Sequence, residues 1–228
     1  MGYILLEGGA EFGGKMAHPD QRALELAGGL DVLISIIPTA AAPDDNHRRA
    51  GGNGKRWFQG LGATNVDVLP LIDRVSANDP AIVDTLKKSR MMYLLGGFPH
   101  YLGQTLLKSN AWQAIVTAYE SGAVIAGSSA GAMVLCEYYY NPADDNIVEG
   151  LGLVEGACII PHHDTSGKSW ANRLKRLLPE TILVGIDEQT GMINDGPLGR
   201  WQVYGKGEVT LYRQGVIRRF TSGDPFDL

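Results

Sequence analysis

Short apolar runs recur along the chain, each bounded by glycine or proline and separated by more polar segments. They occupy residues 3–6, 32–37, 66–69, 91–95, 123–126 and 182–184. Runs of this length that are apolar at nearly every position are typical of parallel strands buried on both faces. Between them, apolar residues recur at helical spacing, as in residues 80–86 and 112–119. The alternation predicts an α/β fold: a mainly parallel sheet with helices on both faces.

The C-terminal segment has a different pattern. Residues 201–204, 209–212 and 216–220 are rich in β-branched and aromatic residues and are separated by glycine-containing turns. They predict a small antiparallel, β-rich extension of the same domain. The glycine-rich residues 50–55 predict a flexible loop. Because neither a repeat nor a linker interrupts the pattern, we expect residues 1–228 to form a single domain.

Composition narrows the class of protein. The net charge of -5 gives no electrostatic reason to expect nucleic acid or an anionic membrane as a partner. No apolar run approaches the ~20 residues that span a bilayer, and the first residues lack the pattern of a signal peptide. We therefore expect a cytoplasmic enzyme. The oligomeric state stays open, with a homodimer among the alternatives.

The segment with the clearest chemistry is Gly127-Ser128-Ser129-Ala130-Gly131, which follows the apolar run 123–126 and precedes helix-forming residues. This is the Gly-x-Ser-x-Gly pattern of a nucleophile elbow, in which small neighbours allow a sharp strand-to-helix turn. Such a turn exposes the serine Oγ and directs backbone N–H groups at a developing oxyanion. The pattern predicts Ser129 as a nucleophile, although a capping serine in a glycine-rich turn would have the same local sequence.

A nucleophilic serine needs a base, and that base needs an orienting carboxylate. His162 and His163 follow the apolar residues 159–160, so they are expected at a strand end, where parallel sheets bind ligands. His100 follows another strand end and could line the same cleft. The acidic residues between Ser129 and His162 are Glu137, Asp144, Asp145, Glu149 and Glu155. Their sequence context alone does not choose among them.

Several segments together resemble the serine peptidase family of dipeptidase E and cyanophycinase, most closely its cyanophycinase-like branch. They are residues 8–11, 37–40, 77–80, 95–97, 122–132, 150–153 and 185–190, in the family's order. The resemblance implies a class I glutamine-amidotransferase-like fold, a three-layer α/β sandwich. It also implies a hydrolase with a Ser-His-Asp triad, an acyl-enzyme, and neither a metal nor a cofactor.

Within that resemblance, the nucleophile falls on Ser129 and the histidine falls on His162 rather than His163. The acid falls on Asp144, which precedes Asp145-Asn146-Ile147-Val148, with Asp145 and Glu149 as alternatives. The oxyanion donors would be the backbone N–H groups of Gly97 and Ala130.

Two departures from the family concern the substrate. Phe98-Pro99 stands where cyanophycinases carry Asp-Gln, and Pro161-His162-His163 is not followed by closely spaced arginines. Cyanophycin itself is therefore in doubt, and a small acidic peptide, aspartyl at its N-terminus, is the milder inference. We expect Phe98 and His163 to contact that substrate.

Two other functions stay open. A catalytically degenerate relative could keep the fold and bind a small ligand. A P-loop NTPase is suggested by Gly9 to Lys15, but Met16 stands where the motif needs Ser or Thr for magnesium.

Overall fold

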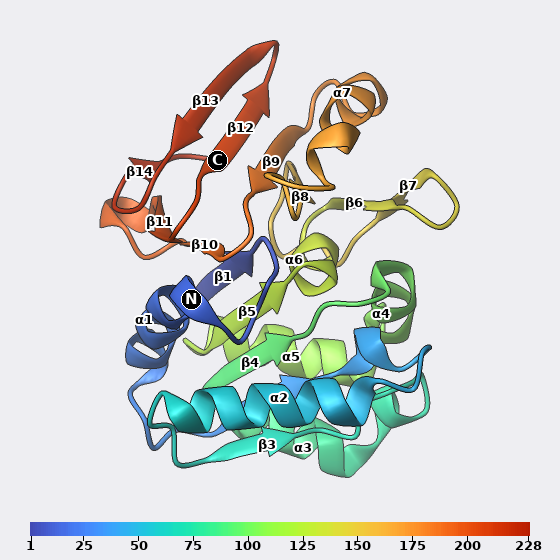
Figure 1. Cartoon of the computed structure of the whole chain (residues 1–228). Helices are drawn as coiled ribbons and strands as arrows, with labels where there is room; N and C mark the ends of the chain where they lie inside the picture. Colours follow the sequence, from blue (N-terminus) through green and yellow to red (C-terminus); the bar gives the residue numbers. More distant parts are fainter.

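An eight-stranded sheet forms the centre of the protein in the computed structural model, which describes residues 1–228 (Figure 1). Its order is β14 (Pro225–Phe226), β11 (Trp201–Gly205), β10 (Thr190–Ile193), β1 (Tyr3–Glu7), β5 (Val124–Ser128), β4 (Met91–Leu94), β2 (Ile34–Ile37) and β3 (Val66–Val68). The five strands from β1 to β3 are parallel to one another, and β10 and β11 pair antiparallel. The predicted mainly parallel sheet is therefore confirmed.

Helices cover both faces of this sheet. Successive side chains of each strand point to opposite faces, so each strand contributes to two cores. Leu5 of β1 packs in one core with α1 (Ala17–Ala27) and α2 (His47–Gly60). Leu6 belongs to the opposite core, with α3 (Pro80–Lys88), α4 (Pro99–Leu106), α5 (Asn110–Glu120) and α6 (Ala130–Leu135). Four short 3-10 helices occupy Gly14–Met16, Thr39–Ala41, Ser76–Asn78 and Pro197–Gly199.

A second, four-stranded sheet lies beyond the central one (Figure 1). Its order is β13 (Val216–Phe220), β12 (Val209–Arg213), β9 (Ile182–Ile186) and β8 (Ala157–Ile160), flanked by α7 (Lys168–Leu177). The hairpin of β6 (Tyr138–Asn141) and β7 (Asn146–Glu149) projects beside it. The apolar run at residues 182–184 is thus a strand of this second sheet, where β9 runs parallel to β8 and antiparallel to β12.

The glycine-rich residues 50–55 do not form the expected loop, because they lie inside helix α2. A Cβ atom on Gly51 would lie 2.4 Å from the Val68 side chain, and one on Gly54 would lie 2.9 Å from the Phe12 ring. Glycine at these two positions lets α2 pack closely on the sheet and on the loop after β1. The intrinsic cost of glycine in a helix is offset by that packing.

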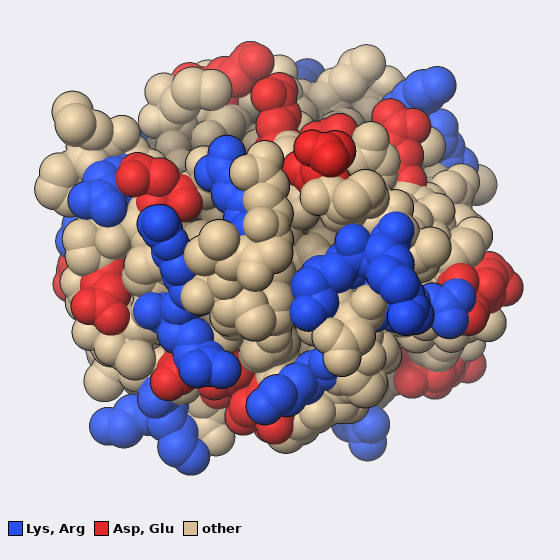
Figure 2. All heavy atoms as spheres, turned by 90° about the horizontal axis from the view of Figure 1, so that it is seen from above, with Lys and Arg blue, Asp and Glu red and all other residues tan.

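The face above the second sheet carries both signs of charge. Figure 2 shows Lys and Arg side chains in several separate strips, with Asp and Glu side chains between and around them. None of the helices combines the length and the apolar character needed to cross a membrane.

Candidate active site

Ser129 occupies the sharp turn between β5 and α6. Its backbone has φ 48° and ψ -109°, a conformation that side-chain-bearing residues rarely adopt. The N–H of Ser129 donates to the carbonyl oxygen of Glu7 at 3.0 Å, which ties the turn to the end of β1. The backbone therefore makes the sharp strand-to-helix turn that the sequence predicts at Ser129.

The glycines of the elbow are needed for space. A Cβ atom on Gly127 would lie 2.5 Å from the carbonyl carbon of Gly131, and one on Gly131 would lie 2.2 Å from the carbonyl oxygen of Leu94. Neither position can hold a side chain unless the backbone of α6 or β4 moves. The motif thus reflects the close approach of α6 to the two central strands.

His162 follows β8 and faces the serine. Its Nε2 lies 3.0 Å from Oγ of Ser129, and its backbone N–H donates to the carbonyl oxygen of Gly8 at 2.7 Å. A Cβ atom on Gly9 would lie 2.2 Å from Cε1 of the His162 ring. The loop after β1 therefore packs directly on the imidazole and fixes its position.

Glu188 contacts the other ring nitrogen of His162. It follows β9, the strand parallel to β8, and its Oε1 lies 2.8 Å from Nδ1 of His162. The Glu188 N–H donates to Oδ1 of Asp164 at 2.9 Å. Ser129, His162 and Glu188 thus come from the ends of three strands, β5, β8 and β9. Such a row can orient the imidazole and let it accept the serine proton.

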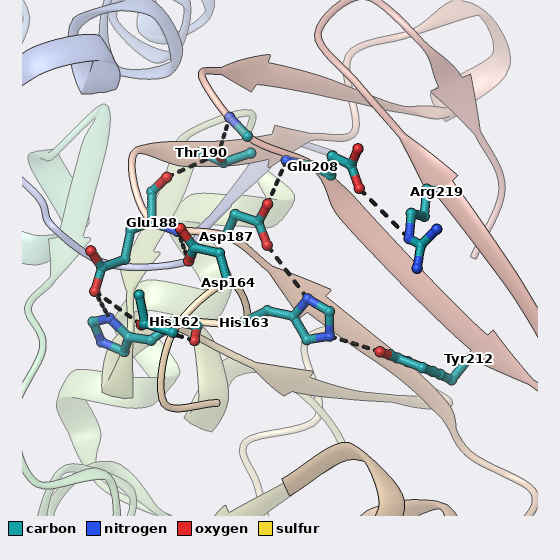
Figure 3. Close-up of polar contacts among 11 residues, drawn as sticks. His162, His163, Asp164, Asp187, Glu188, Thr190, Glu208, Tyr212 and Arg219 are labelled. Carbon is teal, nitrogen blue, oxygen red and sulfur yellow. Dashed lines mark hydrogen bonds and ion pairs between the residues drawn. The ribbon is translucent and has the colours of Figure 1, made fainter. Parts of the chain in front are cut away.

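His163 points the opposite way from His162, as Figure 3 shows. Its Nε2 lies 2.8 Å from the Tyr212 hydroxyl, its Nδ1 lies 3.4 Å from Oδ1 of Asp187, and it is buried. Burial lowers the pKa of His163, against the opposing effect of Asp187. The expected substrate contact is therefore corrected: consecutive residues at a strand end face opposite sides, and His163 braces the second sheet.

The structure does not bring Asp144 to the histidine. Asp144 lies in the exposed turn of the β6–β7 hairpin, where its Oδ2 accepts a hydrogen bond from Asn141 at 2.9 Å. Asp145 pairs with Arg173 at 2.6 Å, and Glu149 lies exposed on β7. The contact assigned to Asp144 from the resemblance is made instead by Glu188.

Sequence reasoning missed Glu188 because it considered only the acids between the serine and the histidine. A usable signal was present: Gly185-Ile186-Asp187-Glu188 ends an apolar run, as the residues before His162 do. Two strands that end in polar residues can pair and bring those residues to one edge.

The backbone N–H groups of Gly97 and Ala130 donate to no other group of the protein. Ala130 directly follows the serine, and a Cβ atom on the neighbouring Gly96 would lie 3.4 Å from Cβ of Ser129. Both N–H groups thus lack an acceptor within the protein, as donors to an oxyanion must. Phe98 is 47% exposed and lines a cavity together with Gly97, so its ring can reach a ligand bound there.

A buried pair of acids lies beneath the elbow. Glu7 and Asp20 are fully buried, and each has one carboxyl oxygen without a partner. The Tyr93 hydroxyl donates to Glu7, and Nε1 of Trp57 donates to Asp20 at 2.7 Å. Burial raises the pKa of Glu7 well above its usual value and that of Asp20 to about 7. The carbonyl of Glu7 accepts the hydrogen bond from the Ser129 N–H, so the buried acid Glu7 is also tied to the elbow through its backbone.

The acid pair makes stability depend on pH. A carboxyl whose folded pKa is raised stabilises the fold below its unfolded pKa, 3.8 for Asp20, and loses that contribution as pH rises to about 7. We expect Asp20→Asn to remove part of this decline, because the amide oxygen can still accept from Trp57. Between pH 5 and pH 8, the unfolding free energy should fall by ~1–3 kcal/mol less than in the wild type. Urea unfolding at both values measures this, and equal declines would contradict the buried-acid account.

Comparison with known proteins shows what this chain is similar to. The sequence model of peptidase family S51 matches residues 4–196. The chain is 27% identical over 226 residues to a cyanophycinase of Synechococcus elongatus, covering 92% of this chain and 67% of that one. The crystal structure of a peptidase from an acI-B1 Actinobacterium is similar with a TM-score of 0.90 and 30% identity, over 100% of this chain and 97% of the other.

A more distant structure shares the fold. It is a putative peptidase E protein of Listeria monocytogenes, with a TM-score of 0.65 and 19% identity, over 93% of this chain and 98% of the other. The predicted α/β architecture and the resemblance to the dipeptidase E and cyanophycinase family are thus confirmed.

Proposed function

This chain belongs to peptidase family S51, and from that premise we propose that it hydrolyses small acidic peptides through Ser129, His162 and Glu188. The family makes it a serine-type peptidase. The observation that carries the choice of residues is the row of two contacts, 3.0 Å from Oγ to Nε2 and 2.8 Å from Nδ1 to Oε1. The strained backbone of Ser129 supports the same choice, since such strain is concentrated at functional sites.

In the acylation step, Oγ of Ser129 attacks the carbonyl carbon of the scissile amide while Nε2 of His162 takes the hydroxyl proton. Glu188 keeps the Nδ1–H tautomer in place and stabilises the imidazolium that forms. The N–H groups of Gly97 and Ala130 donate to the oxyanion of the tetrahedral intermediate. His162 then protonates the amine, which leaves as the C–N bond breaks.

In the deacylation step, the same groups act on water. His162 removes a proton from a water molecule as its oxygen attacks the ester carbonyl of the acyl-enzyme. Collapse of the second tetrahedral intermediate returns the proton to Oγ of Ser129 and releases the acid product.

The substrate class is inferred from the resemblance to the dipeptidase E and cyanophycinase family and from relatives that carry the name cyanophycinase. We infer a peptide or isopeptide whose acyl-side residue is acidic, aspartate above all. The loop of Phe98 and Pro99 borders the oxyanion donor Gly97, so this loop is expected to contact the leaving residue.

The substrate proposal is tested by incubating the purified protein with Asp-Leu in its α-linked and β-linked forms and with Leu-Leu. We expect release of aspartate from at least one aspartyl peptide, at a kcat/KM about 10-fold or more above that for Leu-Leu. Mass spectrometry of the products measures both rates. Cleavage of Leu-Leu at an equal or higher kcat/KM would contradict the acidic specificity.

A further inference from the structure

A cavity of about 700 Å³ lies between α2 and the loop after β1. We call this cavity the α2 groove, and its lining includes Glu11, Phe12, Asn46, Arg49, Asn53 and Arg56. Asn46, which directly precedes α2, and Arg49, Asn53 and Arg56 of α2 recur every three or four positions, so they share one face of the helix. The groove therefore presents a row of polar side chains along the helix.

The two arginines of the α2 groove are held in place without being neutralised. Nε of Arg49 donates to Oδ1 of Asn46 at 2.8 Å, and Nη2 of Arg56 donates to Oδ1 of Asn53 at 2.5 Å. Neither guanidinium forms an ion pair, in contrast to Arg173, which pairs with Asp145 at 2.6 Å. Each keeps most of its five N–H donors free, and a guanidinium matches a carboxylate in planar, bidentate geometry.

Glu11 joins the α2 groove to the nucleophile. Its Oε2 accepts a hydrogen bond from the Ser128 hydroxyl at 3.0 Å. A Cβ atom on Gly96 would lie 3.2 Å from Oε1 of Glu11 and 3.4 Å from Cβ of Ser129. The Glu11 carboxylate and the Ser129 side chain therefore both border the space that a side chain at position 96 would fill.

The loop that carries Glu11 is fixed by aromatic packing. The Phe12 ring lies with its centroid 5.4 Å from that of Tyr93 and 6.5 Å from that of Trp57. Glu11 is thus presented to the groove from a pre-organised loop, which lowers the entropic cost of binding a ligand there.

A second cavity, which includes Gly97, has a different charge. This cavity, of about 660 Å³, is lined by Phe98, Pro99, Tyr101 and Asp144, with no lysine or arginine. An acidic group entering this cavity would meet the Asp144 carboxylate, whereas in the α2 groove it would meet two unpaired guanidinium groups. Charge therefore assigns an acidic residue of a substrate to the α2 groove.

We propose that the α2 groove binds the acyl-side residue of the substrate: Glu11 takes its free ammonium group, and Arg49, with Arg56 beyond it, takes its carboxylate. The inference rests on the proposed peptidase function and deepens it. An N-terminal aspartyl residue carries one ammonium and one free carboxylate whether it is linked through its α or its β carboxyl. The groove would therefore select for a free N-terminus as well as for an acidic residue.

Arg49 has the larger role in this arrangement. It lies in the first turn of α2, which follows the carboxyl end of β2 at the edge of the sheet where Ser129 is found. Arg56 lies about two turns further along, roughly 10 Å away along the helix axis. It is positioned for the far end of the bound residue or for a second acidic group.

The test compares Arg49→Gln and Arg56→Gln with Arg48→Gln, which makes the same change of charge on the same helix outside the groove. We expect Arg49→Gln to lower kcat/KM for Asp-Leu about 10- to 100-fold and Arg56→Gln to lower it less. Hydrolysis of Asn-Leu should change less than about threefold, and Arg48→Gln should resemble the wild type. Equal rates for all three variants on Asp-Leu would overturn the proposal.

Glu11→Gln tests the ammonium contact, because the amide oxygen can still accept from Ser128. The wild type should cleave Asp-Leu at least about 10-fold faster than N-acetyl-Asp-Leu, and the variant should lose most of that preference. An unchanged preference would remove Glu11 from the proposal.

Binding separates this inference from the peptidase function. Calorimetry with L-aspartate on Ser129→Ala should show binding that Ser129→Ala/Arg49→Gln weakens about 10-fold or more. If the wild type cleaves none of the peptides but this difference holds, the proposed function has failed and the groove stands. If the wild type cleaves Asp-Leu and aspartate binds both variants equally, the groove assignment has failed alone.

Discussion

Replacing Ser129 or His162 by alanine is expected to lower kcat by about 10⁴- to 10⁶-fold, with a much smaller change in substrate binding. The serine supplies the bond to the acyl group, and the imidazole, 3.0 Å away, supplies both proton transfers. Since the two act as one unit, the double variant should be scarcely slower than either single variant. The measurement is kcat on an aspartyl dipeptide that the wild type cleaves.

The control for this prediction is His163→Ala. His163 follows His162 directly and is also a histidine, but its ring contacts Tyr212 of the second sheet and Asp187, which follows β9. We expect its loss to lower stability while folded protein retains most of its kcat. If His163→Ala abolished activity in a folded protein and His162→Ala did not, the assignment of the base would be reversed.

Glu188→Gln is expected to lower kcat by about 10²- to 10⁴-fold. Glutamine keeps the size of the side chain but loses the charge that stabilises the imidazolium, and its amide can hold the wrong tautomer of His162. Asp144→Asn, at the exposed hairpin turn, should leave kcat within about threefold of the wild type.

These two variants decide between the acid suggested by the family resemblance and the acid found 2.8 Å from the imidazole. A large loss in Asp144→Asn with little change in Glu188→Gln would mean that the β6–β7 hairpin moves onto the site during catalysis. The parallel pair Asp145→Asn and Glu149→Gln extends the control to the remaining alternatives, and we expect both to stay near the wild type.

Most of the fold could be predicted from the sequence because its strands are buried on both faces. Such strands are apolar at nearly every position, as in residues 91–94 and 124–126, and this signal is local. The pairing of residues 182–186 with β8 and β12 is not local, since an apolar strand carries no mark of the sheet it joins. Helix α2 was missed for a related reason: its glycines serve contacts with Val68 and Phe12 that only the folded chain reveals.

In the candidate site, too, local sequence signals could be read and non-local strand pairing could not. The elbow is a local motif whose small residues have a steric cause, so the sequence alone places Ser129 in a strand-to-helix turn. His162 ends an apolar run, so the sequence also places it at a strand end, and the structure brings the two side chains within 3.0 Å. Glu188 depends on the pairing of β8 with β9, which brings two distant strand ends together, and neither spacing nor composition reports that pairing. His163 was misplaced because sequence order does not say which of two adjacent residues faces the cleft.

The most direct test of the triad is labelling with a fluorophosphonate, followed by peptide mass spectrometry, in the wild type and in the Ser129→Ala, His162→Ala and Glu188→Gln variants. We expect one adduct, on Ser129, that is absent from Ser129→Ala, nearly absent from His162→Ala, and formed many times more slowly in Glu188→Gln. An adduct on another residue, or equal labelling rates in the wild type and Glu188→Gln, would contradict a nucleophile activated by His162 and Glu188.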